Sequence, residues 1–144
     1  MEKVTLTLTL EQAVAVRDAL DLYSRVCIGQ IEEIGQLVRY GTIPMRKPAD
    51  MPREMADADR CDEIVRLLNG VKAVLGYPIS GSNGIGHPHV DASGHRAYEV
   101  KKVLAKALAE HRDPAPQFRG VDYDGLVVRY TQDPAPVAEV VYEQ

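Results

Sequence analysis

The sequence predicts an α+β fold, in which a long N-terminal helix and two further helices pack with a small antiparallel sheet in the order β-α-α-α-β-β-β. Apolar and polar residues alternate strictly over residues 3–10, and three later stretches repeat apolar residues every three or four positions. Two β-prone runs also flank a turn signal near the C-terminus. With 144 residues and no internal repeat or linker-like segment, residues 1–144 are expected to form one domain.

The first 40 residues change from a strand period to a helix period. In "KVTLTLTL", residues 3–10, threonines alternate with apolar residues, which predicts a half-buried strand. Thr9 and Gln12 have the spacing of a capping box and predict that a helix begins here. Apolar residues then recur at helical spacing to about Tyr40, which predicts one continuous helix of roughly 45 Å. A helix of that length outruns a small domain and favours an oligomer.

Two further helices are predicted in the middle of the chain. Residues 41–53 contain three prolines and no periodicity, so a loop is expected there. Apolar stripes predict helices over residues 54–75 and from about Ala92 to His111. Gly76 is expected to stop the second of the three helices.

The last thirty residues predict the remaining strands. Asp124-Gly125 lies between two β-prone runs, a typical signal for a hairpin with a type I′ turn. After it, the run "VAEVVYE" reads as another strand. These strands and the first one are expected to form the antiparallel sheet.

Composition and charge exclude several classes of function. The net charge of −4 and the sequence pI near 5.5 argue against binding to polymeric nucleic acid. No apolar run reaches the roughly 18 residues of a membrane span, and no signal peptide is recognisable, so a cytoplasmic protein without membrane contact is expected. Cys27 and Cys61 lie in apolar helical patterns and are interpreted as reduced core residues.

The segment "GSNGIGHPHVD", residues 81–91, has three possible readings. Its glycines, Gly84 among them, allow backbone N–H groups to approach an anion before a helix N-terminus. It is neither a Walker loop, which needs Gly-Lys-Ser/Thr, nor a dinucleotide fingerprint, which follows a strand. It could instead be a plain turn with Asp91 as the helix N-cap, in which case the protein would be a structural or protein-interaction module.

The third reading of this segment is a metal site. His87 and His89 have the HxH spacing that can hold zinc, and Asp91 or His95 could complete the ligand set, as in a metal-dependent phosphodiesterase or other hydrolase. The spacing is short and common, and Asp91 has a simpler use as a cap. No GxSxG or comparable nucleophile signature occurs, so no catalytic residue and no cofactor are predicted.

Binding residues are easier to nominate than catalytic ones. Tyr77 could stack on a base, Asn83 could bond to the base edge, and Arg46 and Arg96 could hold an anion. Arg96 is a cation in the first turns of a helix, where the dipole disfavours it, so a nearby anion is expected. Arg25 and Gly29 also stand out, because a glycine inside a helix costs about 1 kcal/mol and permits close approach. Arg25 could alternatively pair with Asp21, four residues before it.

The motifs "LDLYSRVCIGQIEEI" and "GIGHPHV…AYEVKKVL" resemble those of small bacteriophage proteins, in which an LYxRxxxGQxEE helix precedes a GI loop and an AYE/D helix. The layout is similar to the Thoeris anti-defence sponge family of the first-described type. The resemblance implies a phage protein that sequesters, without cleavage, the cyclic ADP-ribose signals made by bacterial immune TIR enzymes. It also implies a homo-oligomer, from a dimer to a hexamer, and capture of cyclic oligonucleotides at a second site.

The resemblance also implies which residues contact the ligand. The signal pocket of that family uses arginine, an aromatic side chain and asparagine around the loop between helices. The matching candidates in this sequence are Arg46, Tyr77, Asn83, Gly84 and Arg96. The second site is implied where first helices of different subunits meet, at Arg25 and Gly29. Tyr77 stands where the family pattern has phenylalanine.

Overall fold

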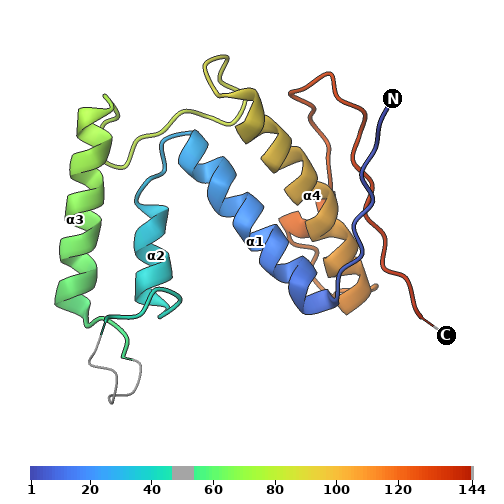
Figure 1. Ribbon diagram of the computed structural model, residues 1–144, viewed down its shortest axis with the longest axis horizontal. Coiled ribbons are helices and arrows are strands. Elements are labelled where there is room, and N and C mark those ends of the chain that lie inside the picture. Colours follow the sequence, from blue (N-terminus) through green and yellow to red (C-terminus); the bar gives the residue numbers. More distant parts are fainter. Residues whose placement is uncertain (47–53, 144) are drawn as a thin grey trace. The chain divides into compact units, whose positions relative to one another are not determined.

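A computed structural model describes residues 1–46 and 54–143, and this part of the chain is helical (Figure 1). None of the helices found in these two ranges is long and apolar enough to cross a membrane. The only pairing of extended segments in the same ranges is an isolated antiparallel bridge between Met45 and Glu54. The elements are α1 (Leu10–Cys27), α2 (Glu33–Arg39), α3 (Ala58–Val74), α4 (Ala92–Arg112) and the short 3-10 helix η1 (Val121–Asp124).

The predicted α+β fold is wrong, because no sheet forms within the described residues. Residues 3–9 are extended, as their alternation predicts, but they join no ladder, and Val4 and Leu6 are 96% and 69% exposed. The predicted hairpin is also absent, because residues 121–124 form η1. Of the two central residues of the predicted turn, Asp124 and Gly125, only Gly125 has positive φ, at 69°. A type I′ turn needs positive φ at both central residues, and Asp124 does not have it.

The C-terminal run stays unpaired for a physical reason. The buried carboxylate of Glu99 accepts the backbone N–H groups of Tyr130 and Thr131, at 2.6 and 3.1 Å, and the Thr131 hydroxyl at 2.6 Å. An α4 side chain thus takes donors that a neighbouring strand would otherwise use. This segment is therefore bound by a helix side chain, and it bends at Thr131 instead of continuing as a strand.

The predicted long first helix is broken in two at Gly29. The N–H of Gly29 donates to Val26 O and that of Gln30 to Arg25 O, at 3.0 and 2.9 Å, with Gly29 at φ +94°. These two bonds and the left-handed glycine are a Schellman motif, which ends a helix. Two predicted helix starts are confirmed, because Thr9 and Gln12 form both bonds of the capping box and Asp91 caps α4. The helix predicted over residues 54–75 begins later, at Ala58, where Asp57 is the cap.

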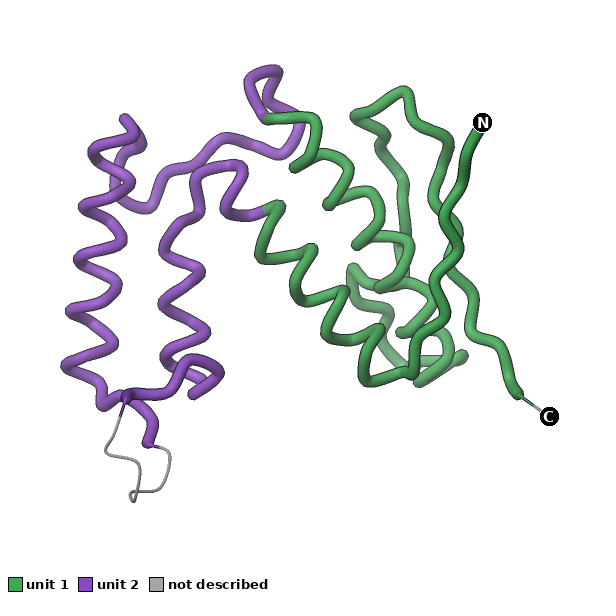
Figure 2. The backbone as a smooth tube through the Cα atoms, viewed as in Figure 1, with its two compact units in different colours: residues 1–24, 91–144 green, residues 25–90 purple. Residues whose placement is uncertain are grey.

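The contacts of the chain form two compact units, residues 1–24 with 91–144 and residues 25–90 (Figure 2). In the first unit, α4 carries most of the buried apolar residues, including Ala97, Ala105 and Leu108. The buried Tyr123 of η1 donates its hydroxyl to Ala109 O and Asp113 O, which fixes η1 against the end of α4.

In the second unit, α2 and α3 pack antiparallel. Lys72, late in α3, pairs with Glu32 just before α2, and Asp62, early in α3, pairs with Arg39 at the end of α2. Gly35 makes the close approach possible, because a Cβ there would lie 2.9 Å from Val65 Cγ2. The helix pair therefore has a defined register and a defined contact face.

Replacing Glu99 by glutamine is expected to destabilise the first unit by about 2 kcal/mol at neutral pH. The amide has only one oxygen to accept the three hydrogen bonds, and it carries no charge to pair with Arg129. Burial is the largest influence and raises the pKa of Glu99, but the bonds from Thr131 and Tyr130 together with Arg129 outweigh it and lower the pKa below 4.5. The stabilisation is thus complete above pH 4.5 and is lost as pH falls through the lowered pKa.

Denaturant titrations at several pH values measure this effect. The wild type should lose stability below pH 4.5 more steeply than the Glu99→Gln variant. Glu110→Gln, an exposed change on the same helix, is the matched control and should leave the profile unchanged. Equal acid sensitivity in wild type and Glu99→Gln would contradict the role given to Glu99.

Candidate functional site

The second unit brings together the C-terminal ends of α1 and α3, which have the same backbone conformation. Gly76 follows α3 at φ +91°; its N–H donates to Ala73 O, and the N–H of Tyr77 donates to Lys72 O. This is a Schellman motif like the one that ends α1 at Gly29. Gln30 and Tyr77 hold equivalent positions, one residue after each left-handed glycine.

The two helix ends touch through Tyr77 and Gly29. A Cβ built on the buried Gly29 would lie 2.5–2.8 Å from three carbons of the half-buried Tyr77 ring. Only a residue without a side chain therefore allows the ring to rest on this backbone. Residues assigned by sequence to two separate sites, Tyr77 to the signal pocket and Gly29 to the helix interface, are in direct contact.

Polar side chains surround this contact. Asn83 donates its backbone N–H to Ile28 O at 2.9 Å and its side-chain amide to the Tyr77 hydroxyl at 3.5 Å. Gln30 accepts from Arg25 at 3.1 Å and donates to the Ser82 hydroxyl at 3.4 Å. We name this group the Tyr77 cradle and define it by the following residues: Arg25, Gly29, Gln30, Tyr77, Ser82 and Asn83.

A buried ion pair lies at the C-terminal turn of α3, from which Tyr77 emerges. Lys72 has no exposed surface, and its Nζ lies 2.8 Å from the carboxylate of Glu32. The two atoms are close enough for an ion pair but are not aligned as a hydrogen bond, and neither has another hydrogen-bond partner in the part of the chain described. Because Lys72 neutralises Glu32, the pair adds little net charge to the cradle.

Two predicted ligand residues in the same unit, Arg46 and Gly84, are not part of the Tyr77 cradle. Arg46 is exposed and follows Met45, whose bridge to Glu54 lies just before α3 begins. Tyr77 follows the other end of α3, a 17-residue helix of about 25 Å. Gly84 is exposed, with no atom within 4 Å of where a Cβ would be.

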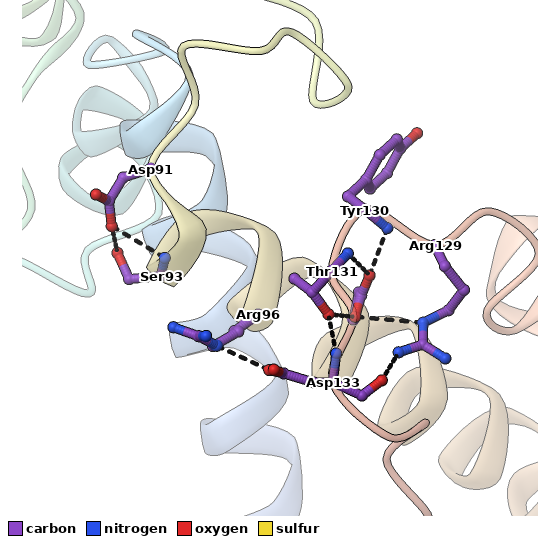
Figure 3. Close-up of polar contacts among 8 residues, drawn as sticks. Asp91, Ser93, Arg96, Arg129, Tyr130, Thr131 and Asp133 are labelled. Atoms are coloured by element: carbon purple, nitrogen blue, oxygen red, sulfur yellow. Dashed lines mark hydrogen bonds and ion pairs between the residues drawn. The ribbon is translucent and has the colours of Figure 1, made fainter.

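Arg96 lies in the first unit, and its charge already has a partner there. Its Nε lies 2.7 Å from a carboxylate oxygen of Asp133 (Figure 3). The hydrogen bond to Asp133, together with that carboxylate's charge, raises the pKa of Arg96. The anion expected beside this cation is therefore a side chain of the same unit.

The candidate metal ligands are engaged in local structure. His89 donates its backbone N–H to His87 Nδ1 at 3.1 Å, while Asp91 accepts the N–H and hydroxyl of Ser93 at 2.9 and 2.5 Å (Figure 3). The bonds from the Ser93 hydroxyl and N–H lower the pKa of Asp91. No cluster of three or more metal-ligating side chains occurs over residues 1–46 and 54–143.

Sequence reasoning missed Gln30, Ser82 and the pair of Lys72 with Glu32. A signal for Gln30 was present, because "CIGQ" repeats the pattern of "VLGY", in which Gly76 was expected to stop a helix. The Lys72–Glu32 pair joins residues 40 positions apart, and no local pattern indicates it.

No family model, no curated protein and no solved structure matches this chain. What the cradle can do is therefore inferred from its own geometry. It offers an aromatic ring, two side-chain amides, a hydroxyl and a guanidinium group. The ring, the guanidinium and the Gln30 amide come from the two helix ends, whereas Ser82 and Asn83 lie in the segment between α3 and α4.

Replacing Gly29 by alanine should destabilise the protein by about 1 kcal/mol more than replacing Gly76. Both residues have φ near +90°, so each alanine has a similar conformational cost of about 1 kcal/mol. Only the alanine at Gly29 would also collide with the Tyr77 ring, since nothing lies within 4 Å at Gly76. Urea denaturation measures the difference in the free energy of unfolding.

The same measurement in a Tyr77→Ala background provides the control. Without the ring, the two alanine substitutions should cost equal amounts. If the additional cost at Gly29 persists when Tyr77 is absent, the contact between the two helix ends is not its cause.

Proposed function

We propose that the chain binds a cyclic nucleotide-type ligand, such as a cyclic ADP-ribose isomer, at the Tyr77 cradle and holds it without cleaving it. The observation that carries this proposal is the convergence of Arg25 with Tyr77 and Asn83, which follow it by about 50 residues in the sequence. The contacts that join them run through Gly29, Gln30 and Ser82.

Each of the three side chains offers a group that nucleotides use. A tyrosine ring held on a glycine backbone is a rigid platform on which a base can stack. The Asn83 amide has both donor and acceptor atoms for a base edge. The Arg25 guanidinium carries positive charge and a planar set of N–H donors that suits a phosphate.

The composition of the cradle favours holding a ligand over attacking it. Its six residues include no histidine, carboxylate or thiol, which are the usual general bases and nucleophiles. Ser82 carries a hydroxyl, but the partner of that hydroxyl is the Gln30 amide, which is not a base. The His87, His89 and Asp91 group, the basis of the alternative hydrolase, has its Asp91 carboxylate occupied in the α4 cap.

The resemblance to the anti-defence sponges supplies the biological role in this proposal. A phage protein of this kind would act in the host cytoplasm by lowering the free concentration of an immune signal. Arg25 and Gly29, which the resemblance assigns to a second site, belong to the same cradle as Tyr77. We therefore propose that cyclic oligonucleotides and cyclic ADP-ribose isomers compete for this cradle.

Incubation with a panel of cyclic ADP-ribose isomers and cyclic di- and trinucleotides tests the proposal. After free ligand is removed and the protein is denatured by heat, mass spectrometry should detect intact ligand. Tyr77→Ala should reduce retention about tenfold, because loss of one stacked base removes roughly 1.4 kcal/mol. Tyr40→Ala, an exposed tyrosine at the other end of the helix pair, is the matched control and should retain ligand.

The possible outcomes separate the alternatives. Chemically altered ligand, with the alteration lost in His87→Ala, would favour the hydrolase. Retention of no member of the panel would refute the binding proposal. Retention of both ligand classes at once, without competition, would show that the cradle is not their common site.

A further inference from the structure

The buried ion pair of Lys72 with Glu32 lies between the contact face of α2 and α3 and the Tyr77 cradle. The two helices run antiparallel and lie side by side (Figure 1). Contacts between the two segments of chain follow one another in regular order: Arg39 with Asp62, Gly35 with Val65, Glu32 with Lys72, and Gly29 with Tyr77. The ion pair is thus one step before the contact of ring and backbone in the cradle.

The backbone also connects both members of the ion pair to that contact. The Tyr77 N–H donates to Lys72 O at 2.9 Å, within the Schellman motif that ends α3. In the facing segment, Glu32 follows Gly29 by three residues and Gln30 by two. A shift of Lys72 relative to Glu32 would therefore move the Tyr77 ring relative to the Gly29 backbone.

Stability alone does not explain this ion pair. Lys72 has no exposed surface, and the Glu32 side chain is 28% exposed. Within residues 1–46 and 54–143, neither Lys72 Nζ nor Glu32 Oε2 has a hydrogen-bond partner, so the desolvation of the ammonium is offset mainly by the charge of the carboxylate. A buried ion pair of this kind can often be replaced by uncharged side chains of similar size with little loss of stability. The contribution left to it is a fixed geometry.

We infer that Lys72 and Glu32 are positioning residues of the cradle, whose ion pair holds the Tyr77 ring on the end of α1. The register of α2 and α3 already has other determinants, in the close approach at Gly35 and the ion pair of Arg39. The buried pair adds a constraint at the end of α3 from which the ring emerges. Uncharged side chains would fill the same space but would not fix the last turn of α3, and a ligand platform needs such support to keep its geometry.

The inference has two consequences, which can be measured separately. The effect of the ion pair on ligand retention rests on the proposed function. Its effect on the contact of Tyr77 with Gly29 needs no ligand.

The neutral double variant, Lys72→Met with Glu32→Gln, removes both charges and keeps similar side-chain lengths. Glu32→Gln alone would leave the buried ammonium without its partner and is avoided. In urea denaturation, the double variant should unfold at a midpoint close to that of the wild type. In this background, the additional cost of Gly29→Ala over Gly76→Ala should disappear, because the ring can move away from the new methyl group.

Ligand retention is the second measurement. The neutral double variant should retain severalfold less cyclic nucleotide than the wild type, approaching the loss of about tenfold expected for Tyr77→Ala. Charge reversal, Lys72→Glu with Glu32→Lys, restores an ion pair and should restore retention. A loss of retention at unchanged stability, with recovery on reversal, distinguishes positioning from a merely structural role. If the reversed variant does not fold, the neutral variant decides.

Arg39→Gln with Asp62→Asn is the matched control, because it removes the ion pair at the other end of the two helices. It should leave both measurements unchanged.

The possible outcomes separate the positioning role from the proposed function. If the additional cost at Gly29 persists in the neutral double variant, or if that variant unfolds far below the wild type, the inference is overturned. If the cost disappears while the wild type retains no ligand, the positioning role is supported and the proposed function fails. Loss of the cost with full retention by the double variant would contradict the assignment of the ligand to the cradle.

Discussion

The contact of the Tyr77 ring with the backbone of Gly29 is the constraint on which the second unit depends. It requires α1 and α3 each to end at a left-handed glycine. The Schellman motif of α1 exposes the Gly29 backbone, and the Schellman motif of α3 places the Tyr77 ring on it. The bond from Asn83 N–H to Ile28 O then fixes the following segment against the same helix end. The contact between Tyr77 and Gly29 thus fixes the Tyr77 ring beside the Asn83 amide. Gln30, the residue after Gly29, holds the Arg25 guanidinium.

The sequence predicted the local features of the fold well and the long-range ones poorly. The Thr9–Gln12 box and the Asp91 cap were predictable because each depends on residues within three positions. The break at Gly29 was missed because apolar spacing continues through it into α2. Alternation over residues 3–9 indicates an extended chain but cannot say whether a strand lies beside it, so the predicted sheet was wrong.

The site shows the same division. Side-chain chemistry identified Tyr77, Asn83, Arg25 and Gly29 as residues to examine. The resemblance assigned them to two separate sites, whereas the Tyr77 ring rests directly on Gly29. For Arg96 the helix dipole correctly indicated an anion, yet the partner, Asp133, is 37 residues away and was not identified. Charge patterns indicate that a partner is needed, whereas only the folded chain decides whether a ligand or a side chain fills that need.

The carboxylate of Glu99 has a consequence for chain entropy. By holding Thr131, it closes a loop of 32 residues without a covalent bond. The entropy cost of closing a loop grows only with the logarithm of its length. Once the bond to Thr131 has formed, contacts inside the loop, such as that of Tyr123 with α4, require the closure of a shorter loop and therefore cost less additional chain entropy. Glu99 can therefore act as a reversible staple whose strength depends on one proton.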